Sequence, residues 1–237
     1  GKFTPPGPVT CYSTATILVR DTLVIAENDS LNLDYKSKVI IDTTGAVLYF
    51  EFGSTLTGNT CGYDFETPPQ QQQWDGDDYI EGDRVLIVNG GRISTEDYDT
   101  GYEYPVIICH ADENYEEVWD GLFFNNINTS QMLRNFDISG IGAISFEDCG
   151  ENRSYAYFND VIIDSIGTIT ADTSVPIKFQ KEEGAGNSLS NIDGGIYMYF
   201  NDIQIEDTEI DDSKIISISY TSYDSVGTYI KNSSLNK

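Results

Sequence analysis

The densest group of candidate metal ligands is an acidic run over residues 75–83, Asp75-Gly76-Asp77-Asp78-Tyr79-Ile80-Glu81-Gly82-Asp83. Ca²⁺ takes about six to eight oxygen ligands in proteins. Its candidate ligands here are the five carboxylates of the run: Asp75, Asp77, Asp78, Glu81 and Asp83. The run is not an EF-hand loop, because Leu86 occupies the position that needs a bidentate glutamate. The alternative is a solvated acidic face, and no cofactor other than calcium is predicted.

The only histidine, His110, follows Cys109, so a cysteine–histidine nucleophile has to be considered. The run Val106-Ile107-Ile108-Cys109 is typical of a buried strand, and neighbouring residues of a strand point to opposite faces. The two side chains therefore cannot act together. Thirty-nine acidic residues offer many carboxylate pairs for acid–base hydrolysis, but no spacing singles one pair out. We predict no catalytic residue and no enzymatic activity.

Four widely spaced cysteines occur in the chain: Cys11, Cys61, Cys109 and Cys149. None belongs to a C-x-x-C pair, so the usual zinc spacing is absent. An even number of cysteines in an acidic chain favours disulfides and an oxidising compartment. The pairing stays open, within one chain or between chains, and buried thiols are the alternative.

Aromatic residues cluster in the acidic segments. The candidates for a contact surface are Trp74, Tyr79, Tyr98, Tyr102, Tyr104, Tyr115 and Trp119. Tyr and Trp are enriched at protein interfaces, whereas Lys is depleted there. Stacking on glycans is a second use of such side chains, and covering the corners of the protein's own fold is a third.

The net charge of −26 disfavours nucleic acid and anionic membrane surfaces as partners. No stretch approaches the roughly 18 apolar residues of a membrane helix, so no membrane insertion is expected. The start Gly1-Lys2-Phe3 is typical of a mature N-terminus left by a signal peptidase, although a recombinant fragment would begin in the same way. Four glycosylation acceptor sites begin at Asn28, Asn128, Asn152 and Asn232. We expect an extracellular or cell-surface location.

Short runs of period two, broken by Gly, Asn, Asp and Ser, predict an all-β fold. An internal repeat favours a solenoid over a sandwich or jelly roll. The apolar pattern Leu133-x-x-Phe136-x-Ile138-x-x-Ile141-Gly142-x-Ile144 recurs 25 residues later as Phe158-x-x-Val161-x-Ile163-x-x-Ile166-Gly167-x-Ile169. A third copy is assigned from Phe200 and a fainter fourth from Ile230, with Leu235 in the place of Ile138. The long interval before Phe200 is expected to hold one more coil and a loop at residues 184–188.

These patterns predict one domain over residues 1–237, a single-stranded right-handed parallel β-helix (β-solenoid) with long acidic loops. Residues 1–20 are expected to form an N-terminal arm or cap, and residues 62–84 a loop excursion. Inward side chains of successive coils would share one core, since a single coil cannot bury its own apolar face.

Two sequence segments resemble successive coils of secreted right-handed parallel β-helix proteins of the pectate-lyase-like superfamily. They are Asp21-Thr22-Leu23-Val24-Ile25-Ala26-Glu27-Asn28-Asp29-Ser30-Leu31-Asn32-Leu33 and Gly45-Ala46-Val47-Leu48-Tyr49-Phe50-Glu51-Phe52-Gly53-Ser54-Thr55-Leu56. Gly90-Gly91-Arg92-Ile93 is similar to a corner of such a coil. The superfamily includes lyases, hydrolases, phage spikes, adhesins and inert surface proteins, so the resemblance implies the fold and leaves the function open.

The hydrolases of this superfamily carry G-H-G and R-x-K motifs. Here His110 does not lie between glycines, no R-x-K occurs, and the pair Asp77-Asp78 has no partner motif. The composition resembles archaeal surface proteins, including methanogen sheath proteins. We therefore expect a structural subunit of an extracellular assembly (a sheath, surface layer or filament) whose partner is a further copy of itself. The alternatives are a glycan-binding adhesin or viral spike module and, less favoured, a polysaccharide-degrading enzyme.

Overall fold

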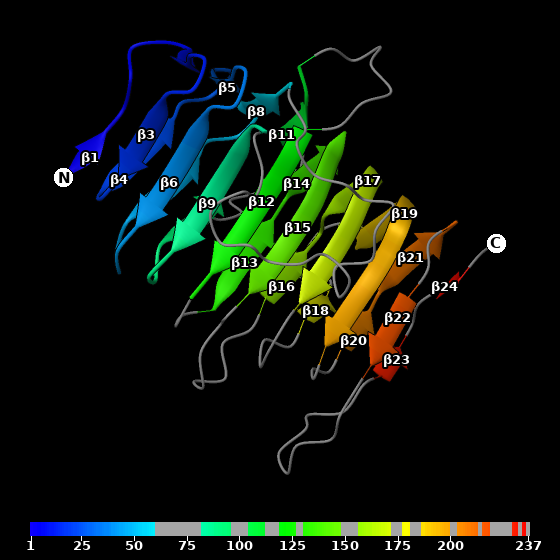
Figure 1. Ribbon diagram of the computed structural model, residues 1–237. Helices are drawn as coiled ribbons and strands as arrows, with labels where there is room; N and C mark the ends of the chain where they lie inside the picture. Colours follow the sequence, from blue (N-terminus) through cyan, green and yellow to red (C-terminus); the bar gives the residue numbers. More distant parts are fainter. Residues whose placement is uncertain are drawn as a thin grey trace.

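The chain is all-β, and its two termini lie at opposite ends of a stack of strands (Figure 1). The computed structural model describes residues 1–59, 82–95, 104–111, 119–126, 130–147, 156–171, 177–180, 186–199, 203–212, 215–218, 229–231 and 234–235. These residues form strands and turns and no helix.

The strands fall into three rows, which we call the first, second and third face. The first face comprises β1 (Lys2–Phe3), β4 (Thr22–Ile25), β7 (Val47–Phe50), β10 (Arg92–Thr95), β13 (Gln131–Arg134), β16 (Ala156–Asn159), β18 (Ile177–Gln180), β20 (Ile203–Glu206) and β23 (Tyr229–Lys231). The second face comprises β2 (Val9–Cys11), β5 (Ser30–Leu33), β8 (Thr55–Gly58), β11 (Val106–His110), β14 (Phe136–Ser139), β21 (Thr208–Asp211) and β24 (Ser234–Leu235). The third face comprises β3 (Thr16–Val19), β6 (Lys38–Asp42), β9 (Arg84–Val88), β12 (Trp119–Asn125), β15 (Ile141–Glu147) and β22 (Ile215–Ile218).

Two long strands join the second face to the third. The first residues of β17 (Ile162–Ala171) pair with β14 and its last residues pair with β15. In the same way β19 (Asn187–Tyr199) pairs with both β21 and β22. Ser165 and Asn191 have positive φ angles of 54° and 50° within these strands, where each turns from one face to the next. The 15-stranded sheet is therefore nearly closed on itself.

Pairing shows how the chain coils. β4 pairs with β7, β5 with β8 and β6 with β9, so consecutive strands belong to different faces. The strand pairs between described residues are all parallel. Each turn of the chain, which we call a coil, thus adds one strand to each face, as in a solenoid. A sandwich or jelly roll would be antiparallel, so that alternative is wrong.

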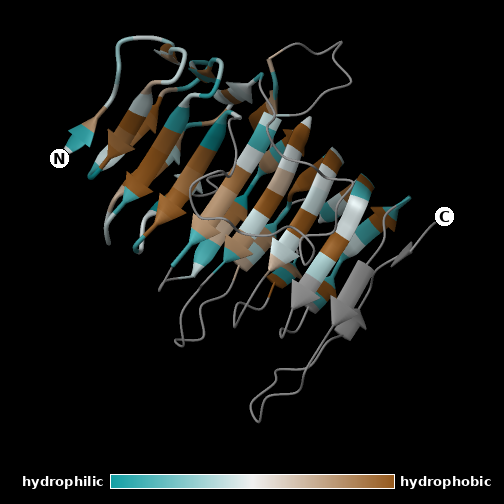
Figure 2. Cartoon of the chain, viewed as in Figure 1, coloured by the Kyte–Doolittle hydropathy of each residue, from teal (hydrophilic) through white to brown (hydrophobic). Residues whose placement is uncertain are grey.

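Alternate residues of each strand point inward and form continuous columns. On the second face the column runs through Val9, Leu31, Leu56, Ile108, Ile138, Ile163, Leu189 and Ile210. On the third face the column runs through Ile17, Val39, Val85, Leu122, Ile144, Ile169 and Ile196. On the first face Phe3, Leu23, Leu48 and Ile93 are in register, as are Leu133, Phe158, Phe179 and Ile205. One apolar cluster fills the interior, and β3, β6 and β9 are brown along most of their length in Figure 2.

The corners between strands use backbone conformations that Asn and Asp tolerate. Asn135, Asp160 and Asp207 have φ angles of 54°, 51° and 47° and each follows directly on a strand of the first face. At another corner, Asn89 donates from Nδ2 to Asp42 Oδ1 at 2.9 Å and accepts from Asn126 Nδ2 at 3.0 Å. Such side-chain ladders replace hydrogen bonds that the corner backbone cannot make.

The 25-residue repeat is confirmed by the strand register. Leu133 is in register with Phe158, and Ile138 is in register with Ile163. The two segments that resemble the first coils, residues 21–33 and 45–56, also stack, since β4 pairs with β7 and β5 with β8. The predicted parallel, solenoid-like arrangement is therefore present over most of the described chain.

The third copy of the repeat was assigned to the wrong register. Phe158 pairs with Phe179, and Phe179 with Ile205, so the coil in the long interval contains β18 and the next copy begins at Ile205. The assignment to Phe200 was five residues too early. The fourth copy is confirmed, because Ile205 is in register with Ile230.

The predicted loop at residues 184–188 is wrong at its end, since Asn187 and Ser188 are the first residues of β19. Residues 1–20 contain β1, β2 and β3, which pair with β4, β5 and β6. Of the excursion at residues 62–84, only 82–84 are described, and Arg84 begins β9.

Candidate functional site

The most distinctive surface is the end of the stack formed by the first coil. β1 lies at one edge of the 4-stranded sheet, and β2 and β3 lie at the two ends of the 15-stranded sheet. No described strand therefore pairs with their outer edges. Such an edge presents a row of backbone N–H and C=O groups that can bind another strand.

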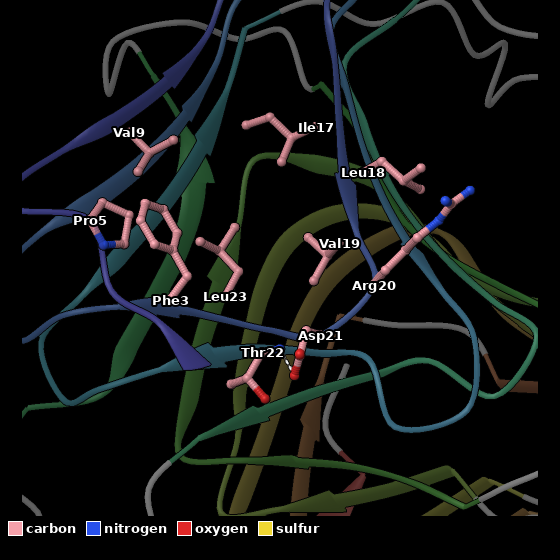
Figure 3. Close-up of a pocket in the computed structure, with 10 residues that line it drawn as sticks. All are labelled: Phe3, Pro5, Val9, Ile17, Leu18, Val19, Arg20, Asp21, Thr22 and Leu23. Carbon is pink, nitrogen blue, oxygen red and sulfur yellow. Dashed lines mark hydrogen bonds between the residues drawn. The ribbon is translucent and has the colours of Figure 1, made fainter. Parts of the chain in front are cut away.

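An apolar groove of about 330 Å³ opens at this end, and we call it the end groove. Its lining consists of Phe3, Pro5, Val9, Ile17, Leu18, Val19, Arg20, Asp21, Thr22 and Leu23 (Figure 3). Phe3, Val9 and Ile17 are the first members of the three inward columns. The groove therefore exposes the first residues of the apolar columns that form the core.

Phe3 shows most clearly that no described coil covers this end. Its side chain is 63% exposed, although Leu23 and Leu48, which follow it in the same column, are buried. An aromatic ring that points along a core column and yet meets solvent leaves a large apolar area in water. The exposure results from the position of Phe3 in the stack, because no described coil lies below it.

Not every lining residue points into the opening. Leu18 and Arg20 alternate with Ile17 and Val19 along β3, and in Figure 3 they lie on the other side of the strand. Asp21 Oδ1 accepts a hydrogen bond from the Thr22 backbone at 3.0 Å. Most of the side chains that line the groove are apolar, and they are suited to binding a hydrophobic edge.

The charge of the chain is distributed unevenly relative to this end. Residues 1–38 contain four basic and four acidic residues, so they are neutral overall. Residues 39–224 contain seven basic and 35 acidic residues, whereas residues 225–237 contain two lysines and no acid. The acidic excess therefore belongs to the middle of the chain, and both end segments lack it.

Of the predicted calcium ligands, only Asp83 lies within the described residues. Its carboxylate is fully buried and accepts backbone N–H groups from Ser37 at 2.8 Å and Asn59 at 3.0 Å. It therefore ties together the corners of neighbouring coils. Asp75, Asp77, Asp78 and Glu81 lie outside the described residues, and the described part of the chain contains no group of three or more His, Cys, Asp or Glu that could hold a metal.

The contact-surface prediction is wrong for Trp119. Its side chain is fully buried, and its indole N–H donates to the Cys109 carbonyl at 2.9 Å. Tyr104 is 62% exposed, and its role in a contact surface stays a prediction. The other predicted contact residues, Trp74, Tyr79, Tyr98, Tyr102 and Tyr115, lie outside the described residues.

Cys109 and His110 are adjacent residues of β11, where His110 is buried and Cys109 is half-buried. The alternation agrees with side chains that point to opposite faces. Cys11 is buried in β2, and no disulfide joins it to Cys109. Two strands, β5 and β8, separate β2 from β11, which exceeds the reach of a disulfide. Cys61 and Cys149 lie outside the described residues.

Asn28 is exposed at a corner with a φ angle of 60°, so an acceptor side chain is accessible there. The other predicted glycosylation sites, Asn128, Asn152 and Asn232, lie outside the described residues. Glycosylation of Asn28 therefore remains a prediction.

Sequence reasoning missed two electrostatic pairs. Arg84 Nη2 lies 3.6 Å from Asp120 Oδ2 in a buried ion pair. Burial lowers the pKa of Arg84, and the charge of Asp120 opposes that shift.

The second pair lies on the second face, where burial and the charge of Asp164 raise the pKa of Asp137. Burial alone would raise the pKa of Asp164, but hydrogen bonds from Ser190, Asn191 and Ser165 together lower it. No spacing in the sequence indicated either pair, because their members come from different coils.

Comparison with known proteins gave no match to a family model, a curated protein or a solved structure. Among the described residues, no helix is long and apolar enough to cross a membrane.

Proposed function

We propose that the chain is a structural subunit of an extracellular assembly, such as a sheath, surface layer or filament, built by self-association of β-solenoids. In this proposal the fold is a single-stranded right-handed parallel β-helix of the pectate-lyase-like type, located at the cell surface. The partner is a further copy of the chain.

The observation that carries the proposal is the outer face of the coil formed by β1, β2 and β3, which no described strand covers. An apolar groove and three strand edges lie together at one end of the stack. In solenoid proteins, terminal repeats with a polar outer face cover the core and keep the protein soluble. The face that no described strand covers favours association instead, since covering it removes apolar surface from water and pairs the strand edges.

Two further features support a structural role. Seven of the ten residues that line the groove are apolar, as a surface that binds another apolar surface requires. The acidic middle of the chain keeps neighbouring solenoids apart laterally and so favours contacts through the ends.

Sedimentation velocity over a wide range of protein concentration tests the proposal, together with negative-stain electron microscopy of the same samples. We expect oligomers that grow with concentration and with added salt, because salt screens the repulsion between acidic copies. A chain that stays monomeric at millimolar concentration in 0.15 M salt would contradict the proposal.

A further inference from the structure

We infer that two copies of the chain pair side by side through the third face, around a two-fold axis parallel to the stack of coils. In this arrangement the strands of the two faces run antiparallel, and each coil meets the same coil of the second copy. The inference rests on the proposed self-association and names two surfaces that meet. The contact is made by outward side chains of β3, β6 and β9, which we call the lateral patch: Leu18, Lys38, Ile40, Asp42, Leu86 and Val88.

The centre of the lateral patch is an apolar row across three neighbouring strands (Figure 1). Leu18 is in register with Ile40, and Ile40 with Leu86. Leu18 is 47% exposed, and Ile40 and Leu86 are half-buried. Both β6 and β9 lie between two other strands of the face, so the exposure of Ile40 and Leu86 does not depend on how the stack ends. Contiguous apolar side chains on an outer surface are typical of a contact site.

The accessible part of this row is short. Phe123 on β12 is in register with Leu86 and points outward in the same way, but it is only 6% exposed. A second copy therefore reaches the row at β3, β6 and β9 and not beyond Leu86.

The charges beside the row identify the occupant as a second copy. On β6 the outward residues are a cation, an apolar side chain and an anion in turn: Lys38, Ile40 and Asp42. Within the described part of the chain Lys38 makes no ion pair. With antiparallel strands, Ile40 lies opposite Ile40 of the second copy, and Lys38 lies opposite its Asp42. The two-fold axis produces this ion pair twice, because each copy presents the same patch to the other.

The same order of charges continues along the third face. Arg84 is in register with Lys38, and Asp42 belongs to the column that leads through Val88 to Glu147. Across β3, β6, β9, β12 and β15 the cations thus lie in one outward column and the outward carboxylates in the other. Antiparallel pairing sets one column against the other, whereas parallel pairing would set like charges against each other. The charge order therefore selects the two-fold arrangement.

The overall charge confines the contact to these coils. Residues 1–38 are neutral overall, whereas residues 39–224 carry the acidic excess. Sheets that pack face to face are inclined by about 30°, so the later, acidic coils of the two copies diverge from the contact. A two-fold contact uses the same patch on both copies and closes at the dimer. Growth beyond the dimer takes place at other surfaces.

Charge reversal tests the inference by sedimentation velocity in about 0.15 M salt. Lys38→Asp sets a carboxylate against Asp42 of the second copy, and Asp42→Lys sets a cation against its Lys38. Each variant alone is expected to raise the dimer dissociation constant about tenfold or more, because two attractive pairs become repulsive. An equimolar mixture of the two variants is expected to recover the dimer, since every introduced charge then faces its opposite.

A second set of variants acts at Ile40 alone. Asp42 Oδ1 accepts a hydrogen bond from Asn89 at 2.9 Å, so Asp42→Lys also disturbs a corner. Ile40→Asp and Ile40→Lys leave that corner intact and place like charges opposite each other in the row. Each is expected to stay monomeric alone, and their mixture is expected to form dimers. Ile162→Asp is the matched control, because Ile162 is an exposed aliphatic side chain on the second face, and it should associate like the wild type.

The outcomes separate this inference from the proposed assembly. Wild-type association that is unaffected by the Lys38, Asp42 and Ile40 variants overturns the inference and leaves self-association standing. Mixtures that stay monomeric, although circular dichroism shows both variants folded, also overturn it. Wild-type dimers that dissociate on charge reversal and never grow larger support the lateral contact and contradict the extended assembly. A wild type that stays monomeric at millimolar concentration overturns both.

Discussion

The ring of Phe158 stacks on the ring of Phe179, with centroids 4.8 Å apart and planes inclined by 24°. The two residues belong to β16 and β18, which pair as neighbouring strands of the first face. Phe158 also meets the edge of Phe146 on the third face, at 6.3 Å and 84°. Phe158 therefore connects two coils and two faces at the centre of the core.

Phe158→Ala should lower the free energy of unfolding by about 3–5 kcal/mol, because it removes a fully buried ring and leaves a cavity. Urea denaturation followed by circular dichroism measures the change. Ile162→Ala is the control, since its side chain is 47% exposed, and it should change stability by less than about 1 kcal/mol. Equal effects of the two substitutions would show that Phe158 does not lie in the core.

The position of Phe179 was not predictable from the repeat, and the reason is geometric. Leu133 and Ile138 are five residues apart and lie on neighbouring faces, because a single corner residue, Asn135, separates β13 from β14. Inward apolar residues therefore recur at a spacing of five from one face to the next, as well as at a spacing of 25 from one coil to the next. An alignment of the repeat that is shifted by five residues places each apolar residue on the neighbouring face and still matches apolar positions. The assignment of the third copy to Phe200 was such a shift.

The end groove was not predictable for a different reason. Alternation in the sequence indicates which side chains point inward, but not whether another coil covers them. Phe3 lies 20 residues before Leu23, its partner in register, and Val9 lies 22 residues before Leu31. These spacings are shorter than the later repeat of 25, and they are interrupted by Pro5, Pro6 and Pro8. Residues 1–20 therefore resembled an arm.

Asp83→Ala should lower the free energy of unfolding by about 2–3 kcal/mol. The substitution removes the acceptor for the backbone N–H groups of Ser37 and Asn59, and buried donors without acceptors are costly. Thermal or urea denaturation without added metal measures the effect. A stability equal to that of the wild type under these conditions would show that the carboxylate does not brace the corners.

Asp137→Asn should raise the free energy of unfolding at pH 7 by about 0.5 kcal/mol, the size typical of a cross-strand pair. Burial and Asp164 raise the pKa of Asp137 above its ordinary value of 3.8, so the folded state binds that proton more tightly than the unfolded state does. The ionised carboxylate therefore penalises folding above the raised pKa. The penalty disappears as the pH falls below 3.8, and the gain from the substitution should disappear with it.

Asp164→Asn should have the opposite effect at pH 7 and lower stability. Hydrogen bonds from Ser190, Asn191 and Ser165 lower the pKa of Asp164 despite its burial, so its ionised form stabilises the folded state. That contribution is present above the ordinary pKa and is lost as the pH falls through the lowered value. Denaturation of both variants between pH 3 and pH 7 measures the pair. Shifts of the same sign at pH 7 would contradict the assignment.

Gly121→Ala should lower the free energy of unfolding by about 3 kcal/mol or more. Gly121 has a φ angle of 112°, which side-chain-bearing residues rarely adopt, and a Cβ there would collide with the backbone carbonyl of Ala143 on the neighbouring strand. Gly7→Ala is the matched control, because nothing lies within 4 Å of the Cβ it would add. The control should be neutral or slightly stabilising, since alanine restricts the unfolded chain. If Gly121→Ala were tolerated as well as Gly7→Ala, β12 and β15 could not pair as closely as this register requires.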